Sequence, residues 1–172
     1  TLVRVWTEIG DCVAAAGVRK LLLFNAHGGQ VGLMDIVGRD LRARHDMIVY
    51  HSNWYDLPLA DAAMAPFSPA ERRFGVHAGD IETSMMLAIR PAQVDMAQAR
   101  DFPSTSQQRA QDYPILGNGK SARLAWQMQD YNPQGAAGNA AAATADKGDA
   151  LRASAGTQLA LLLAELSRLP LS

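Results

Sequence analysis

The segment between residues 20 and 50 constrains the fold more than any other part of the sequence. It begins with a short apolar run at residues 21–24, which is typical of a strand buried on both faces. A His-Gly-Gly turn follows at residues 27–29, then a pattern of apolar residues at helical spacing, and then a second apolar run at 47–50. Because strand, turn, helix and strand make one βαβ unit, we expect two parallel strands joined by a right-handed crossover.

The totals of the sequence describe an ordinary globular domain. Its 172 residues carry a formal net charge of -1, and 48% of them are hydrophobic. A nearly neutral chain gives no electrostatic basis for binding nucleic acid or an anionic membrane, so we expect neither as a partner. Cys12 is the single cysteine and suits a reducing compartment, which predicts a cytoplasmic protein. Length and composition together predict one domain over residues 1–172.

Helical patterns lie on both sides of the βαβ unit. Apolar spacing predicts a first helix over residues 1–17, and a leucine-rich pattern predicts a long closing helix over residues 140–169. Residues 52–74 and 102–139 are interrupted by prolines and are expected to be irregular, with a short helix at 121–129. We therefore predict an α/β fold with a mostly parallel central sheet. Because the chain opens on a helix, we also expect that the N-terminal part of its domain is truncated.

The first candidate functional cluster follows the end of the first strand. Its residues are Asn25, His27, Gly28 and Gly29. They come at the carboxyl edge of the predicted sheet, where open α/β proteins keep their binding sites. The glycines allow the backbone to approach a ligand closely, and the amides of the following helix can face an anion. His27 is therefore a candidate site residue, with the other three as candidates for binding substrate. The alternative for His27 is that it merely caps the turn.

The second candidate cluster lies at the head of a helix predicted over residues 83–89. It contains His77, Asp80 and Glu82, with Gly79 as a hinge. A carboxylate at the start of a buried helix needs a partner, and a metal ion or His77 would serve Glu82. The helix dipole alone also favours a carboxylate there. Asp80 is a candidate for binding substrate, although the commonest role of an aspartate in this position is to cap the helix.

A tryptophan follows the second strand of the βαβ unit. Trp54 could wall a pocket for a flat ligand, or it could pack at the rim of the core. The sequence contains neither a Gly-x-Ser-x-Gly nucleophile elbow nor a phosphate-loop lysine motif. An esterase that used the His-Gly-Gly turn as an oxyanion hole would need such an elbow, so we do not predict one.

Taken together, the two clusters resemble motifs of the creatininase (creatinine amidohydrolase) family. Its members typically show a hydrophobic strand ending in Asn-Gly-His-Gly-Gly-Asn, and residues 25–30 read Asn-Ala-His-Gly-Gly-Gln. A later family motif, His-Ala-Gly-x-x-Glu-Thr-Ser, is matched by residues 77–84. Residues 135–148 resemble a third family passage, Gly-x-x-Gly followed by Ala-Thr-x-x-x-Gly. The resemblance therefore covers nearly the whole chain.

The resemblance implies a three-layer α/β/α fold and a metal-dependent amidohydrolase. The substrate would be a small cyclic or formyl-type amide, the cofactor divalent zinc, manganese or iron, and the assembly a homo-oligomer, often a hexamer. By position, His27 would be a metal ligand and His77 the general acid/base. Glu82 would be either a metal ligand or the carboxylate that orients His77. In both cases we expect His27 and Glu82 to converge at one end of the sheet, with His77 alongside.

Two departures from the family pattern modify this expectation. The family carries an N-terminal strand with a Glu-x-His pair and a following Asp that bridges the metals, and no such pattern occurs here, so this chain alone could be inactive. Creatininase itself has an acidic ligand at the position of Gly29, which favours a creatininase-like relative such as the formamide-hydrolysing or peptide-processing branches. One alternative is a truncated, non-catalytic relative that binds ligand or forms oligomers. Another is a sugar- or nucleotide-binding α/β module that binds a phosphate at the helix start after Gly29.

Overall fold

The computed structural model describes residues 1–171 of the chain. Its contacts divide the chain into two compact units. Unit 1 comprises Thr1–Leu59 together with the chain from Ala155 onward, and unit 2 comprises Ala60–Ser154. That residues 1–172 make up one domain stays a prediction.

The βαβ unit predicted from the sequence forms the centre of unit 1. Strand β1 (Lys20–Asn25) pairs in parallel with β2 (Ile48–Asn53), and helix α2 (Val31–Arg44) makes the crossover. The register runs without a slip through all 6 residues of each strand, so both strands end at the same edge. The prediction that β1 is buried on both faces is wrong, because Phe24 is 42% exposed. In the described part of the chain, β1 has a strand neighbour on one side only.

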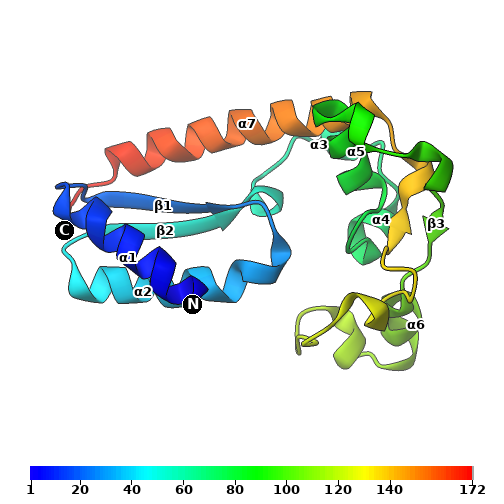
Figure 1. The fold of residues 1–172 in the computed structure, drawn as a ribbon, viewed down its shortest axis with the longest axis horizontal. Helices are drawn as coiled ribbons and strands as arrows, with labels where there is room; N and C mark the ends of the chain where they lie inside the picture. The colour runs from blue at the N-terminus through cyan, green and yellow to red at the C-terminus, as the bar shows by residue number, and fades with distance from the viewer. Residues whose placement is uncertain (172) are drawn as a thin grey trace. The chain divides into compact units, whose positions relative to one another are not determined.

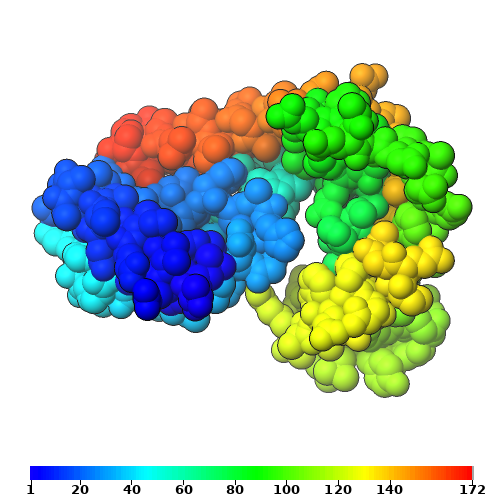
Figure 2. Space-filling model, viewed as in Figure 1, coloured from blue at the N-terminus to red at the C-terminus, as the bar shows by residue number. Residues whose placement is uncertain are grey.

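Helix α2 and helix α1 (Leu2–Ala15) lie on one side of this sheet (Figure 1). The core of this layer contains Met34, Val37 and Leu41 of α2, each at most 2% exposed. Burying a side chain of this kind stabilises the fold by about 1.5–3 kcal/mol. At the contact between the helices, a Cβ added to Gly10 would lie 2.4 Å from the side chain of Leu41. Figure 2 shows α1 at the surface of unit 1, in agreement with its exposed apolar side chains.

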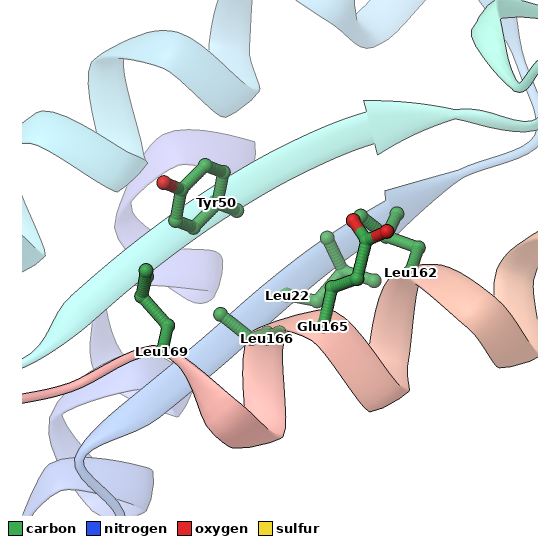
Figure 3. A pocket seen from close by; sticks show the side chains of 6 residues that line it. All are labelled: Leu22, Tyr50, Leu162, Glu165, Leu166 and Leu169. Atoms are coloured by element: carbon green, nitrogen blue, oxygen red, sulfur yellow. The ribbon is translucent and has the colours of Figure 1, made fainter.

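The carboxyl-terminal part of helix α7 (Ala145–Arg168) lies on the other side of the sheet (Figure 1). Nζ of Lys20 donates to the carbonyl of Ser167 at 2.6 Å, which joins β1 to this helix. Figure 3 shows the groove between them, with a volume of about 150 Å³ and lined by Leu22, Tyr50, Leu162, Glu165, Leu166 and Leu169. Unit 1 therefore has helix, parallel sheet and helix layers, which confirms the predicted α/β/α class.

Unit 2 is built from short elements. They are α3 (Asp61–Met64), α4 (Pro69–Phe74), α5 (Asp80–Ile89), α6 (Thr105–Asp112) and the antiparallel pair of β3 (Asp101–Phe102) with β4 (Gly138–Asn139). The helix expected at 121–129 is absent, since those residues are irregular apart from a single 3-10 turn, Met128–Asp130. The segment is mostly exposed, and a short helix without a surface to pack on is marginal. Nowhere in residues 1–171 is a helix long and apolar enough to cross a bilayer.

Helix α5 packs closely against the start of α7 within unit 2. Ser84 is completely buried, and a Cβ added to Gly148 would lie 2.0 Å from its carbonyl oxygen. The two backbones can approach this closely because residue 148 is a glycine. Oγ of Ser84 also accepts a hydrogen bond from the backbone N–H of Thr144 at 3.1 Å. These contacts fix the position of the helix that begins in the second candidate cluster.

Candidate active site

His77 and Glu82 form a close pair in unit 2. Nδ1 of His77 lies 3.1 Å from Oε2 of Glu82, and the two side chains are 52% and 49% exposed. A carboxylate at this distance stabilises the positive charge that the imidazole carries when protonated. The other ring nitrogen, Nε2, takes no part in this contact, which is made through Nδ1. One nitrogen thus faces a negative charge while the other can exchange a proton with a bound molecule, as a general acid/base requires.

The loop between the two residues holds Glu82 in place. The backbone N–H of Ala78 donates to Oε2 of Glu82 at 2.7 Å, and Oγ1 of Thr83 donates to the carbonyl of Ala78 at 3.3 Å. Ala78 has a φ of 52°, a left-handed conformation that is unfavourable for a residue with a side chain. Backbone strain of this kind is often found at functional sites, where the surrounding structure maintains it.

A distant segment anchors the backbone of His77. The N–H of Ala137 donates to the carbonyl of His77 at 2.8 Å, and the N–H of Val76 donates to the carbonyl of Ala137 at 2.8 Å. Ala137 is completely buried. Ala137 lies in the passage 135–148 that resembled a family motif, so that passage supports the His77 loop.

Asp80 belongs to a buried polar network. Its side chain is 4% exposed, and its Oδ2 lies 2.8 Å from Nζ of Lys147. Its Oδ1 accepts a hydrogen bond from Oγ of Ser84 at 3.0 Å. The N-cap of α5 is Gly79, so Asp80 does not cap the helix. Since both carboxylate oxygens are engaged within unit 2, the structure gives Asp80 a role in packing, and its role in binding substrate stays a prediction.

In unit 1, the side chain of Asn25 organises the turn that follows β1. It is 3% exposed, and its Nδ2 donates to Oδ1 of Asn53 and to the carbonyl of His27, both at 2.7 Å. Its Oδ1 accepts from the N–H of His27 at 3.1 Å and from Nε2 of Gln30 at 2.8 Å. These bonds use the donors and acceptors of the amide to shape the loop. The role of Asn25 in binding substrate therefore stays a prediction.

His27 caps the turn that it begins. Its Nδ1 accepts a hydrogen bond from the N–H of Gly29 at 3.1 Å, and the residue is exposed. An added Cβ at position 29 would lie 3.1 Å from Cε1 of His27, so the glycine makes room for the ring. A neutral histidine that binds a metal through Nε2 carries its ring proton on Nδ1, so Nδ1 then donates a hydrogen bond and cannot accept one. Ligation through Nε2 would therefore require the bond to Gly29 to break, and the role of His27 as a metal ligand stays a prediction.

The loops that follow β1 and β2 lie side by side. Gly28 begins a 3-10 turn, and a Cβ on it would lie 3.6 Å from the hydroxyl of Tyr55. Tyr55 also meets the ring of Trp54 edge-on, with centroids 5.8 Å apart. The carboxyl edge of the sheet thus gathers the predicted residues of unit 1, which are Asn25, His27, Gly28, Gly29 and Trp54. Unit 2 gathers His77, Asp80 and Glu82, and the convergence of His27 with Glu82 stays a prediction.

The described residues do not supply a complete metal site. Among residues 1–171, no group of three or more His, Cys, Asp or Glu side chains could hold a metal ion. A catalytic metal normally has three protein ligands. The donors present in the described part of the chain therefore do not fit a catalytic metal by themselves.

Three supporting residues were not predicted from the sequence. Asn53 pairs with Asn25, and the occurrence of an asparagine at the end of each strand was the signal for this contact. Lys147 neutralises Asp80 from within the Ala-Thr-x-x-x-Gly passage. Glu71 is buried beside the His77 loop, and the sequence around it carries no motif that indicates this.

The family model described as Creatininase, creatinine amidohydrolase, matches residues 1–163. The sequence matches none of the curated proteins at a significant level.

Solved structures share this fold. A provisionally named creatinine amidohydrolase from Bacteroides fragilis is 27% identical with a TM-score of 0.76, and the match covers 100% of this chain and 63% of that one. A creatininase is 22% identical with a TM-score of 0.72, covering 99% and 64%. A mutant creatininase of Zn-Zn type is 22% identical with a TM-score of 0.70, covering 96% and 63%. The chain thus spans less than two thirds of the length of these relatives.

Proposed function

Since the chain belongs to the creatininase family, we propose that the intact protein hydrolyses the C–N bond of a small cyclic or formyl-type amide. The observation that carries this proposal is the pairing of His77 with Glu82 at 3.1 Å in a half-exposed loop. A similar structure is of a mutant creatininase complexed with creatine, which supports a small molecule with C–N bonds as the substrate class.

His77 is the general acid/base of the proposed reaction. Its Nε2 accepts a proton from the water that attacks the carbonyl carbon, and the resulting imidazolium is stabilised by Glu82. The C–N bond then breaks, and the same proton passes from Nε2 to the leaving nitrogen. The products are an acid and an amine, or a ring-opened amino acid when the amide is cyclic.

Glu82 is the carboxylate that orients His77 in this proposal. Oε2 of Glu82 both approaches Nδ1 of His77 and accepts the N–H of Ala78, so this oxygen is engaged by the loop. This geometry supports the orienting role over the alternative role of metal ligand.

A divalent zinc or manganese ion is the proposed cofactor. Similar structures include a mutant creatininase of Zn-Zn type and a creatininase described with Mn, which supports this choice. His27 is the proposed ligand within this chain, and further ligands would come from other residues of the intact protein. A hexameric assembly and a cytoplasmic location also remain predictions.

The alternative is a non-catalytic relative that binds ligand without turnover. Metal analysis of the purified intact protein separates the two functions. The hydrolase should retain at least about one tightly bound divalent ion per subunit, whereas the non-catalytic relative should retain fewer.

The direct test is turnover of formamides and of cyclic amides, including creatinine, by the intact protein and its variants. His77→Ala should lower kcat by about 10²–10⁴-fold on the accepted substrate, which is the usual contribution of a general acid/base. His45→Ala is the matched control, because His45 pairs with Asp11 on the α1–α2 layer of unit 1. Undiminished turnover by His77→Ala would refute the assigned role.

A further inference from the structure

Glu71 of α4 is a buried carboxylate without a cation beside it in the described part of the chain. The residue is 6% exposed. Its Oε1 accepts the backbone N–H of Ile81 at 3.2 Å, and its Oε2 accepts the backbone N–H of Asn139 at 2.9 Å. Burying a charge is unfavourable unless hydrogen bonds compensate for the lost water. These two bonds therefore explain what a glutamate does in this position.

The two bonds reach both flanks of the His77–Glu82 pair. Ile81 precedes Glu82 in the first turn of α5, where backbone N–H groups lack partners within the helix. The N-cap Gly79 offers no side chain to satisfy them, so Glu71 takes over this task. On the other flank, Asn139 follows the segment whose Ala137 exchanges hydrogen bonds with the His77 loop.

Glycines enclose the carboxylate of Glu71. A Cβ added to Gly79 would lie 2.4 Å from its Oε1, and a Cβ added to Gly138 would lie 2.7 Å from its Oε2. Gly138 also has a φ of 139°, which other residues rarely adopt. Side chains in either position would displace the carboxylate, so the two glycines leave a slot that Glu71 fills.

We infer that Glu71 is a positioning residue that holds the backbone on both sides of the His77–Glu82 pair, an inference that rests on the proposed function of that pair. A carboxylate is required because each oxygen accepts a different N–H. Glutamine at position 71 would turn an NH2 group towards one of these N–H groups, so that donor would face donor. The loop and the helix would then shift relative to each other, and Nδ1 of His77 would move away from Glu82.

The test compares Glu71→Gln with Glu8→Gln in the intact protein. Glu8 undergoes the same chemical change, but it is exposed and pairs with Arg4 in an i,i+4 arrangement. Glu71→Gln should lower kcat by about 100-fold, as small displacements of reacting groups do. KM should change little, because Glu71 is buried and both of its carboxylate oxygens are engaged by backbone N–H groups. It should also speed hydrogen exchange at Ile81 or Asn139 and shift the imidazole NMR signals of His77. Glu8→Gln should do none of these.

Glu71→Asp is the second variant, and it is measured whether or not Glu71→Gln folds. It retains two acceptor oxygens on a shorter side chain, so its loss of kcat and its shift of the His77 signals should be smaller than for glutamine. The inference is overturned if His77 signals and kcat stay at wild-type values in the folded Glu71 variants, or if only KM or thermal stability changes. An active His77→Ala enzyme would instead refute the proposed function. In that case the His77 signals of the wild type and the Glu71 variants would still test whether Glu71 positions the pair.

Discussion

Nδ1 of His77 lies 3.1 Å from Oε2 of Glu82 because Ala78 adopts a left-handed backbone conformation and the chain then forms the first turn of helix α5. Ala78 has a φ of 52°, and its N–H donates to the same carboxylate oxygen of Glu82 at 2.7 Å. Both residues of the pair therefore come from one short motif, while Ala137 and Glu71 hold the backbone of that motif in place.

Removing the side chain of Ala78 should relieve the strain of its left-handed backbone conformation. A left-handed conformation costs a residue with a Cβ about 1–2 kcal/mol, and glycine in turn costs about 0.5–1 kcal/mol in chain entropy. Ala78→Gly should therefore leave the free energy of unfolding unchanged or raise it by up to about 1.5 kcal/mol in urea denaturation. Ala160→Gly, on the exposed face of the right-handed helix α7, should lower it by about 1 kcal/mol. Equal losses in both variants would contradict the strain at Ala78.

Removing the charge of Lys147 should destabilise unit 2. Lys147 lies 2.8 Å from Asp80, and the two side chains are 18% and 4% exposed. Lys147→Met would leave Asp80 buried and unpaired, which should lower the free energy of unfolding by about 3–5 kcal/mol. Arg152→Met is the matched control, since Arg152 pairs with Asp149 on the surface and should change stability by less than about 1 kcal/mol. A small effect of Lys147→Met would mean that Asp80 is not held as described.

Acid should weaken the contact between α1 and α2. Hydrogen bonds from Arg44 hold the pKa of Asp11 and the pKa of Asp40 below their usual range. A lowered pKa stabilises the folded state at pH values above the unfolded pKa of about 3.9, and this contribution is lost as the pH falls through the folded value. The melting temperature should therefore fall as the pH drops below about 4. Asp11→Asn should make this fall shallower, and an unchanged slope would show that the Asp11 contact does not contribute.

Substituting His27 should affect metal content more than folding. If His27 is a metal ligand, His27→Ala should reduce the zinc or manganese retained by the intact protein after dialysis against a weak chelator, measured by mass spectrometry. His51→Ala is the control, because His51 lies on β2 and its ring is 3.6 Å from Asp35. Equal metal content in the wild type and His27→Ala would leave His27 with the capping role that its bond to Gly29 shows.

The elements that rest on local patterns were predictable from the sequence. The βαβ unit follows from two apolar runs around a helix, and the His77–Glu82 pair follows from a motif in which both residues are close in the chain. The contacts of Glu71 with Asn139 and of Lys147 with Asp80 were not predictable, because these partners are 68 and 67 residues apart in the chain and meet only through tertiary packing. The helix at 121–129 was wrong for a related reason, since its local pattern had no surface to pack against.

The roles of the two asparagines show the limit of motif reasoning. Asn25 stood in a family-like motif and was therefore expected to touch substrate. Its side chain bonds to Asn53 and to the turn around His27, contacts that the motif did not indicate, and its role in binding substrate stays a prediction. A motif residue can therefore shape the loop of a site, whether or not it also contacts the ligand.

A double-mutant cycle on kcat/KM, made with His77→Ala, Glu82→Gln and the double variant, tests the central claim most directly. If the two residues act as one proton-transfer unit, each single variant should lose nearly as much activity as the double variant. Independent losses that multiply in the double variant, or full activity of His77→Ala, would contradict it.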